Sequence, residues 1–381
     1  MADPHGDAVV VGAGAFGAWT ALSLVERGAR VTLVDANGPG NLLGSSGGES
    51  RNLRAAYGDR LVYTRWAMRA LTLWQRREAE FGRQLFFPSG SLRAMSSSEA
   101  SAQAAAFEAV GQPHALLGGD EVRTRWPQIG CTDAEHFLFE PRAGILLARD
   151  AMIAVADAFR RRGGRVLQGV AEGPPRVAGR LAVLRVGREE ISAGCFVFAC
   201  GPWLPRLFPD LLGRYIKTPR RELFFLGPTP GDRRYDWDRC PNLTDADGWT
   251  SANIGGGVKF APVIRHVPMD PDDGERLPTP ALLDQVRRFA RKRLPGLAKR
   301  PVVATYVSQL ENSDNEHFII DRHPELSDVV IAGGGSGHAF KMGPVIGEHV
   351  AGLVLGDEQD AALHALFSLA AHGPVPPGVG G

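Results

Sequence analysis

Two glycine-rich turns and a few isolated basic residues are the parts of this chain whose types and spacing could do chemistry. Residues 12–17 read Gly-Ala-Gly-Ala-Phe-Gly, and residues 333–338 form a second turn that Lys341 follows closely. Glycine lets the backbone of such a turn approach a ligand, and the free N–H groups at the start of a following helix attract phosphate. The first turn therefore predicts a dinucleotide site.

The segments around the first turn would position a dinucleotide. The β-branched run 8–11 predicts a buried strand, residues 18–27 predict an amphipathic helix, and residues 31–34 predict a second strand that ends at Asp35. The positive end of the helix dipole would then face the phosphates. Asp35 is placed to accept hydrogen bonds from the ribose hydroxyls of an adenosine.

Each glycine of the first turn has its own role in such a unit. Gly12 permits the tight turn, Gly14 lets the backbone approach a diphosphate, and Gly17 lets the helix lie against the strand. A glycine-rich loop without a nucleotide is the alternative. It is disfavoured because strand, glycines, helix, second strand and acid all fall within one unit of ordinary length.

Strand–helix alternation recurs further along the chain, while the segments between have short β-like runs and many turns. This pattern predicts an α/β fold, α+β overall, in which a Rossmann-like nucleotide-binding domain is interleaved with a domain built on a mostly antiparallel sheet. The predicted nucleotide-binding domain comprises 1–84, 145–217 and 305–371, the second domain comprises 85–144 and 218–304, and 372–381 form a flexible tail.

Two local predictions concern segments near the expected site. Arg51 and Arg54 are three residues apart, and we expect them at the start of a helix. Residues 86–95 predict a pair of strands that turns at Ser89 and Gly90.

The composition is that of an ordinary globular protein. The 381 residues are 44% hydrophobic and 22% charged, with a formal net charge of +1. This balance gives no reason to expect nucleic acid or a membrane as a partner. Four cysteines without a CxxC pattern predict neither a disulfide framework nor a metal site. Since the first residues lack the features of a signal peptide, we expect a cytoplasmic protein. We also expect a monomer or a small homo-oligomer.

Taken together, these segments resemble the D-amino-acid oxidase and sarcosine oxidase superfamily of FAD-dependent amine oxidases. The monomeric sarcosine oxidase and N-methyltryptophan oxidase branch is the most similar. The resemblance extends through nearly the whole chain. It is sharpest in the first turn with Asp35, in residues 44–58, in Glu316-His317-Phe318-Ile319-Ile320-Asp321-Arg322-His323-Pro324, and in Ser336-Gly337-His338-Ala339-Phe340-Lys341.

The resemblance implies a role for individual residues. Arg54 and Lys341 would bind a substrate carboxylate, Lys259 would lie near flavin N5 and assist the reaction with oxygen, and His338 would line flavin and substrate. Without this motif context, each basic residue would more often be a solvated surface charge. The residues expected to contact FAD are Gly12, Gly14, Ala15, Phe16, Gly17, Asp35, Ser45, Ser46, Arg51, Val170, Cys200, Gly201, Trp203, Gly335, Gly337, His338 and Lys341.

The chain departs from this branch in two places. The branch tethers FAD through a cysteine shortly before the Glu316 motif, but residues 302–315 contain no cysteine, so we expect noncovalent FAD. Val263 stands where the branch has an active-site histidine, which predicts an altered substrate pocket. Aromatic residues near that pocket either favour a bulky or aromatic substrate or belong to the core: Phe86, Phe87, Phe224, Phe225 and Trp249.

The implied reaction is oxidation of an amino acid or N-alkyl amino acid. Hydride would pass from the carbon next to nitrogen to flavin N5, leaving an imine, and O₂ would reoxidise the flavin to give H₂O₂. An FAD-dependent dehydrogenase with another electron acceptor is an alternative. An NAD-dependent dehydrogenase is a further alternative, but it would not need the segment from Gly337 to Lys341. A noncatalytic flavoprotein is another, which the combination of Arg54, Lys259 and Lys341 disfavours.

Overall fold

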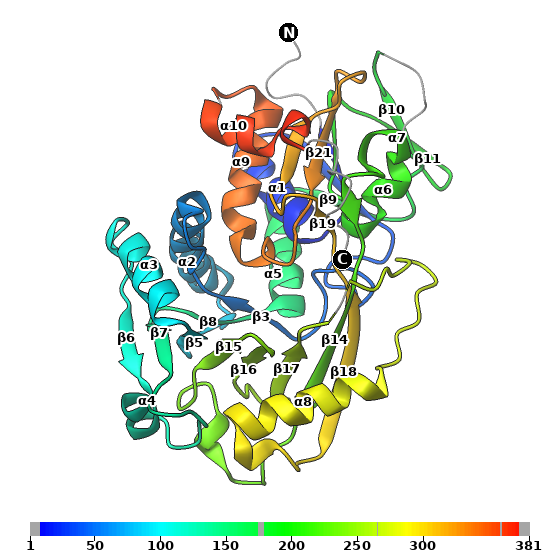
Figure 1. The fold of residues 1–381 in the computed structure, drawn as a ribbon. Coiled ribbons are helices and arrows are strands. Elements are labelled where there is room, and N and C mark those ends of the chain that lie inside the picture. Colours follow the sequence, from blue (N-terminus) through cyan, green and yellow to red (C-terminus); the bar gives the residue numbers. More distant parts are fainter. Residues whose placement is uncertain (1–7, 174–178, 265, 359, 373–381) are drawn as a thin grey trace.

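The computed structural model describes residues 8–173, 179–264, 266–358 and 360–372 (Figure 1). The predicted tail therefore lies outside the described residues, except for His372. A six-stranded and an eight-stranded sheet form the two halves of the molecule, and a small three-stranded sheet lies between them (Figure 1).

The six-stranded sheet is built from strands far apart in the sequence. Its four pairings from β21 to β9 are parallel, and only β20 is antiparallel to its neighbour. The strand order is β20 (Ile319–Arg322), β21 (Val329–Gly333), β12 (Cys195–Phe198), β1 (Ala8–Val11), β2 (Val31–Asp35) and β9 (Arg165–Gln168). The carboxyl ends of parallel strands lie along one edge of the sheet, and this is the edge at which ligands bind in α/β proteins.

Each face of this sheet has its own hydrophobic core. Val10 of β1 belongs to the core shared with long helices, whereas Val9 and Val11 face the other side, as side-chain alternation along a strand requires. The helices are α1 (Ala15–Glu26), α2 (Leu61–Phe81), α5 (Ala148–Arg161), α9 (Gly343–Leu355) and α10 (Ala361–Phe367). The other face carries β10 (Val183–Val186), β11 (Glu189–Ser192), α6 (Leu204–Leu207) and α7 (Pro209–Leu212).

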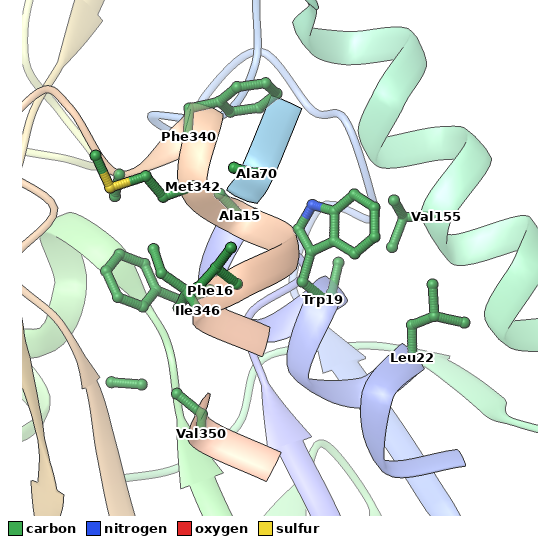
Figure 2. Packing of buried hydrophobic residues seen from close by; sticks show 14 of the residues in the cluster. Ala15, Phe16, Trp19, Leu22, Ala70, Val155, Phe340, Met342, Ile346 and Val350 are labelled. Atoms are coloured by element: carbon green, nitrogen blue, oxygen red, sulfur yellow. The ribbon is translucent and has the colours of Figure 1, made fainter. Parts of the chain in front are cut away.

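Helix α1, which follows the first glycine turn, is held in place by close contact with α9. A Cβ added at Gly343 would lie 2.5 Å from Cδ1 of Trp19, and one added at Gly347 would lie 2.5 Å from the Trp19 backbone. Figure 2 shows Trp19 on α1 with its ring toward Val155 of α5. Trp19 also meets the edge of Trp74 from α2 at 5.1 Å between centroids. Three helices therefore fix the start of α1.

The eight-stranded sheet is antiparallel except for the pairing of β15 with β5. Its order is β18 (Val302–Gln309), β14 (Arg220–Leu226), β17 (Val258–Pro262), β16 (Gly248–Ser251), β15 (Asn242–Asp245), β5 (Ser91–Met95), β7 (His136–Glu140) and β6 (Ala115–Gly118). The helices of this half are α3 (Ser97–Glu108), α4 (Gly119–Arg125) and α8 (Pro280–Arg293). Helix α8 packs on the sheet through Phe289, which meets Phe260 edge to face.

The small sheets connect the two halves. The order β3 (Ser50–Leu53), β8 (Gly144–Leu147), β4 (Phe86–Phe87) is antiparallel throughout. A further short pair joins β13 (Ile216–Lys217) to β19 (Asn312–Ser313). The division into two domains stays a prediction. Strand β18 crosses the predicted boundary between residues 304 and 305.

The structure corrects two local predictions. Arg51 lies in strand β3, and Arg54 directly follows that strand, so neither starts a helix. Residues 86–95 form no hairpin, because β4 pairs with β8 while β5 joins the eight-stranded sheet. At the crossing, Gly90 donates to the Ala143 carbonyl, and its φ of +74° takes the chain from one sheet into the other.

Within the described residues, no helix has the length and apolar character to cross a membrane.

Candidate active site

A cavity of about 490 Å³ lies at the carboxyl ends of β1, β2 and β12. It is bordered by the first glycine turn, by the loop after β2 and by the turn after β12. Eleven of the residues predicted to contact the cofactor line it: Gly12, Gly14, Ala15, Phe16, Asp35, Ser45, Ser46, Val170, Cys200, Gly201 and Trp203. The cavity is therefore where the sequence predicts the dinucleotide.

Backbone contacts shape the first turn. A Cβ at Gly12, whose φ is +102°, would lie 2.3 Å from the Ala199 carbonyl oxygen, and one at Gly17 would lie 1.9 Å from the Gly12 oxygen. Gly17 lets α1 pack on the turn and does not line the cavity. Gly14 is the N-cap of α1 and supplies no side chain. The Ala15 N–H donates to Ser46 Oγ at 2.9 Å.

Asp35 holds the turn from the end of β2. Its Oδ2 accepts from the Ala13 N–H at 2.7 Å, and its Oδ1 accepts from the Asn37 N–H at 2.9 Å. Burial raises the pKa of this carboxyl, while these N–H groups oppose the rise. Asp35 therefore combines contact with the turn and access to the cavity.

These features fit an adenine dinucleotide. Glycine at positions 12 and 14 keeps side chains out of the cradle, and the dipole of the 12-residue helix α1 points its positive end there. None of the described residues that line the cavity is Lys, Arg or His. A diphosphate would therefore rely on backbone N–H groups and on the helix dipole.

Strand β3 leads from the cavity to the basic residues. Arg51 donates to the carbonyls of Ser45, Gly47 and Ser50 at 2.6–2.7 Å. Its guanidinium lies 5.7 Å from the centroid of the Phe340 ring, and burial lowers its pKa. Arg51 therefore braces the loop beside the cavity, although it does not line the cavity itself.

Lys259 is buried on β17 against the start of β3. Its Nζ donates to the Ser50 carbonyl at 2.9 Å and to Ser50 Oγ, and it lies 5.6 Å from the Trp249 ring centroid. Burial and the Arg51 charge lower the pKa of Lys259 to about 7, against the opposing charge of Glu49. Its ammonium is therefore charged on the acidic side of neutrality.

Arg54 and Lys341 meet at the ring of Tyr57. The Arg54 guanidinium is 5.4 Å from the ring centroid and the Lys341 Nζ is 5.2 Å from it. Arg54 donates to the Ala56 carbonyl at 2.5 Å. Lys341 has no hydrogen bond from Nζ to any described residue, and burial and Arg54 hold its pKa well below the usual range. The charge of Glu140 opposes this fall in the pKa of Lys341. Because Arg54 and Lys341 form no ion pair among the described residues, the two basic groups are a candidate site for an anion.

His338 lies beside this pair in an aromatic cage. Its ring stacks on Phe318 at 4.9 Å between centroids and meets the edge of Tyr63. Nδ1 is 3.4 Å from the Tyr57 hydroxyl and Nε2 is 3.0 Å from the Glu316 carbonyl oxygen. Burial and the Lys341 charge lower the pKa of His338 to about 3. It is neutral at ordinary pH, which suits positioning better than proton transfer.

The structure thus forms two groups from the predicted residues. One lines the cavity. The other is the basic set Arg51, Arg54, Lys259 and Lys341 with His338, which β3, β17 and the segments 54–57 and 336–341 place beyond it. Gly335 and Gly337 belong to the turn between the groups, where Gly337 has a φ of +70°.

Three residues of the site had no predicted role. Tyr57 lies in the segment 44–58 that carries the family resemblance, but its contact with both Arg54 and Lys341 depends on the fold. Glu140 of β7 accepts from the Ala55 N–H at 2.7 Å and so holds the segment that carries Arg54. Glu311 lines the cavity from the segment after β18. An isolated acid in a sequence carries no signal for either position.

The predicted substrate-pocket residues have different fates. Val263 is 57% exposed, and Phe86 and Phe224 are buried in hydrophobic cores. Phe87 and Phe225 likewise pack against hydrophobic clusters. Trp249 and Phe225 both neighbour Lys259 of the basic set, Trp249 through its ring and Phe225 as the cross-strand partner. The core alternative thus holds for most of these aromatic residues.

Comparisons with known proteins agree with this geometry. A family model described as "DAO: FAD dependent oxidoreductase" matches residues 7–353. The chain is 30% identical to monomeric sarcosine oxidase of Bacillus sp. (strain B-0618), covering 92% of both chains, and 28% identical to N-methyl-L-tryptophan oxidase of Salmonella dublin, covering 92% of this chain and 95% of that one.

The fold has a close counterpart among solved structures. The crystal structure of L-proline dehydrogenase from P. horikoshii matches with a TM-score of 0.84 at 21% identity, covering 95% of this chain and 96% of that chain. The predicted fold class and family resemblance are confirmed. The chain belongs to the FAD dependent oxidoreductase family matched over residues 7–353, and FAD is its cofactor.

Proposed function

We propose that this FAD-dependent oxidoreductase oxidises the C–N bond next to the carboxylate of an amino acid or N-alkyl amino acid, with O₂ as electron acceptor and H₂O₂ as product. The observation that carries the proposal is the pair of cations on Tyr57, Arg54 and Lys341, which has no acidic ion-pair partner among the described residues. The relatives named for sarcosine and N-methyl-L-tryptophan support this substrate class.

Arg54 and Lys341 would bind the substrate carboxylate. A guanidinium donates in a planar fork that matches a carboxylate, and the ammonium adds a second charge. Lys341 is buried and Arg54 is half-buried, and the charge of Glu140 compensates Lys341 only in part, so a bound carboxylate would offset the cost of burying the lysine charge. This anchoring fixes the carbon next to the nitrogen for reaction. FAD supplies the hydride acceptor when bound.

Neighbouring residues would keep this cation pair in place. Glu140 holds the backbone that carries Arg54, and the Lys341 carbonyl accepts from Trp74 Nε1 at 2.7 Å. His338 packs on the Tyr57 side and stays neutral, so it adds no third charge. These contacts let the pair keep its geometry without a substrate.

Lys259 would support the reaction with oxygen. Its ammonium is fixed by Ser50 in a buried setting, where a positive charge stabilises developing negative charge on O₂ far more than it would in water. An FAD-dependent dehydrogenase with another acceptor is the alternative, and turnover with and without air separates the two.

The expected attachment of FAD is noncovalent. Residues 302–315, where the resemblance would place a tethering cysteine, contain none. The last two residues of β18 in this segment are Ser308 and Gln309, and both are buried. Cys200 does line the cavity, but burial raises the pKa of its thiol, which leaves little thiolate for a covalent bond. We therefore expect acid precipitation to release the flavin into the supernatant. Yellow colour that stays with the precipitate would contradict noncovalent binding.

The experiment that tests the proposed function is an anaerobic substrate screen. Sarcosine, N-methyl-tryptophan, other N-methyl amino acids and primary amino acids would each be mixed with the purified protein, and loss of flavin absorbance recorded. Each active compound would be repeated as its carboxamide, which lacks the anion. Bleaching by acids but not by amides supports the proposal, whereas equal bleaching by both contradicts carboxylate recognition.

A further inference from the structure

Glu311 is a buried acid in the cofactor cavity that the proposed chemistry does not use. It is 7% exposed, it lines the cavity, and its Oε2 has no hydrogen-bond partner among the described residues. A buried polar atom without a partner carries a substantial free-energy cost. Such an atom at a ligand cavity indicates that the ligand completes its hydrogen bonding.

Three glycines clear the space around this carboxyl group. A Cβ at Gly333 would lie 3.1 Å from Oε2, one at Gly335 would lie 3.1 Å from Oε1, and one at Gly201 would lie about 3.9 Å from the group. The same Cβ at Gly335 would lie 3.3 Å from the Phe16 ring, at the start of α1. Glu311 therefore stands between the second glycine turn and the phosphate-binding end of the first.

The surroundings of Glu311 favour its neutral form. Burial raises the pKa of Glu311 to about 8, although the N–H groups of Gly334 and Gly335 oppose the rise. The other titratable residues that line the cavity are Asp35, Cys200 and Asp272, and none is basic. An incoming diphosphate adds negative charge and so disfavours an ionised Glu311 further.

We propose that Glu311 binds FAD as a protonated carboxylic acid, donating its hydrogen to an oxygen of the diphosphate–ribityl part of the cofactor. A neutral acid can donate where a carboxylate can only accept. A protonated Glu311 would give the cavity a side-chain hydrogen-bond donor, although no Lys or Arg lines it among the described residues. The proposal concerns cofactor binding alone, so it stands or falls independently of the substrate.

Release of FAD from the holoenzyme tests the proposal without any turnover. The wild-type holoenzyme would be diluted into buffers from pH 6.5 to pH 9.5, and released FAD measured by its fluorescence. If one proton must be bound with FAD, the dissociation constant should rise about tenfold per pH unit above roughly pH 8. A flat profile over this range would overturn the proposal.

Two variants show whether Glu311 causes the pH dependence. Glu311→Gln keeps a neutral donor of nearly the same shape, so it should bind FAD as the wild type does at pH 7 and lose the rise above pH 8. Glu348→Gln makes the same substitution at a surface acid of α9 that pairs with Arg69 and does not line the cavity, and it should keep the wild-type profile. A Glu311→Gln profile identical to that of the wild type would overturn the proposal.

Infrared spectra of the holoenzyme give a second readout. At pH 8.5 the wild type and Glu348→Gln should both show a carboxylic acid C=O stretch that the Glu311→Gln holoenzyme lacks. If Glu311→Gln does not fold, the pH profile of FAD release from the wild type and its infrared spectrum decide the question. A wild-type spectrum without any carboxylic acid band at that pH would contradict a protonated Glu311.

Discussion

The buried position of Lys259 makes its proposed role testable by pH. Because burial and Arg51 lower its pKa to about 7, the charged fraction falls as pH rises from 6 to 8. If the ammonium assists oxygen, reoxidation of the reduced flavin should slow over this range. The rate constant of reoxidation, measured by mixing reduced enzyme with O₂ at each pH, checks this sign.

Replacing Lys259 by Met removes the charge and keeps much of the volume. Reoxidation by O₂ should slow by about a hundredfold or more, the usual size for loss of one stabilising group in a buried site. It should also lose its pH dependence, whereas flavin reduction by substrate should change little. Equal slowing of both half-reactions would contradict the role assigned to Lys259.

The carboxylate pair can be tested one residue at a time. Arg54→Ala or Lys341→Ala should lower kcat/KM for an acidic substrate by about 10- to 100-fold, which corresponds to one charge-assisted hydrogen bond. Arg60→Ala is the matched control, since Arg60 pairs with Glu316 at the surface and should leave kcat/KM within about twofold. Steady-state kinetics with the acid and its amide would show whether the loss depends on the carboxylate.

At the scale of elements, the contact of α1 with α9 determines where the first turn sits. Gly347→Ala would insert a methyl group within 2.6 Å of the Trp19 carbonyl oxygen. The gain in helix propensity is smaller than the strain of such overpacking, so the free energy of unfolding should fall by about 1–3 kcal/mol. FAD affinity should fall as well, because α1 would shift.

A neighbouring surface position provides the control for that variant. Glu348→Ala lies on the same helix and loses only a surface ion pair with Arg69, which contributes about 0–1 kcal/mol. Denaturant unfolding of both variants and of the wild type measures the difference. A Gly347→Ala protein as stable as Glu348→Ala would mean that α9 can move away from α1 at no cost.

Local sequence signals predicted the elements around the first turn because their determinants lie within a few residues of one another. Strand 8–11, the glycine turn and the second strand ending at Asp35 form as the pattern implies. The helix forms too, but it begins at Ala15 and is buried on all sides from Ala15 to Leu24 rather than amphipathic. The segment 86–95 does not, because its two strands find partners, β8 and β7, far along the chain. Arg51 likewise lies in β3, whose partner β8 comes almost a hundred residues later.

At the scale of the molecule, the strands of each sheet come from separated parts of the chain. The interleaving explains why the site could be foreseen only in part. Individual basic residues could be assigned through the family resemblance, but the meeting of Arg54 and Lys341 on Tyr57 depends on β3 and η4 (Phe340–Met342) lying side by side. Glu140 and Glu311 reach the site through the tertiary fold alone.

The whole molecule also separates the two tasks of the site in space. The FAD cavity lies at the edge of the six-stranded sheet, while Lys259 comes from the eight-stranded sheet and Lys341 from the segment before α9. Strand β3 links these places. The proposed function therefore requires both halves of the molecule to keep their relative positions.

The most direct test of the account is anaerobic mixing of the yellow protein with amino acids and N-methyl amino acids while the flavin absorbance is followed. We predict that at least one such compound with a free carboxylate bleaches the flavin, that its carboxamide does so far more slowly, and that admitting air restores the colour with formation of H₂O₂. Flavin that no carboxylate-bearing amine reduces, or that amides reduce equally well, would contradict it.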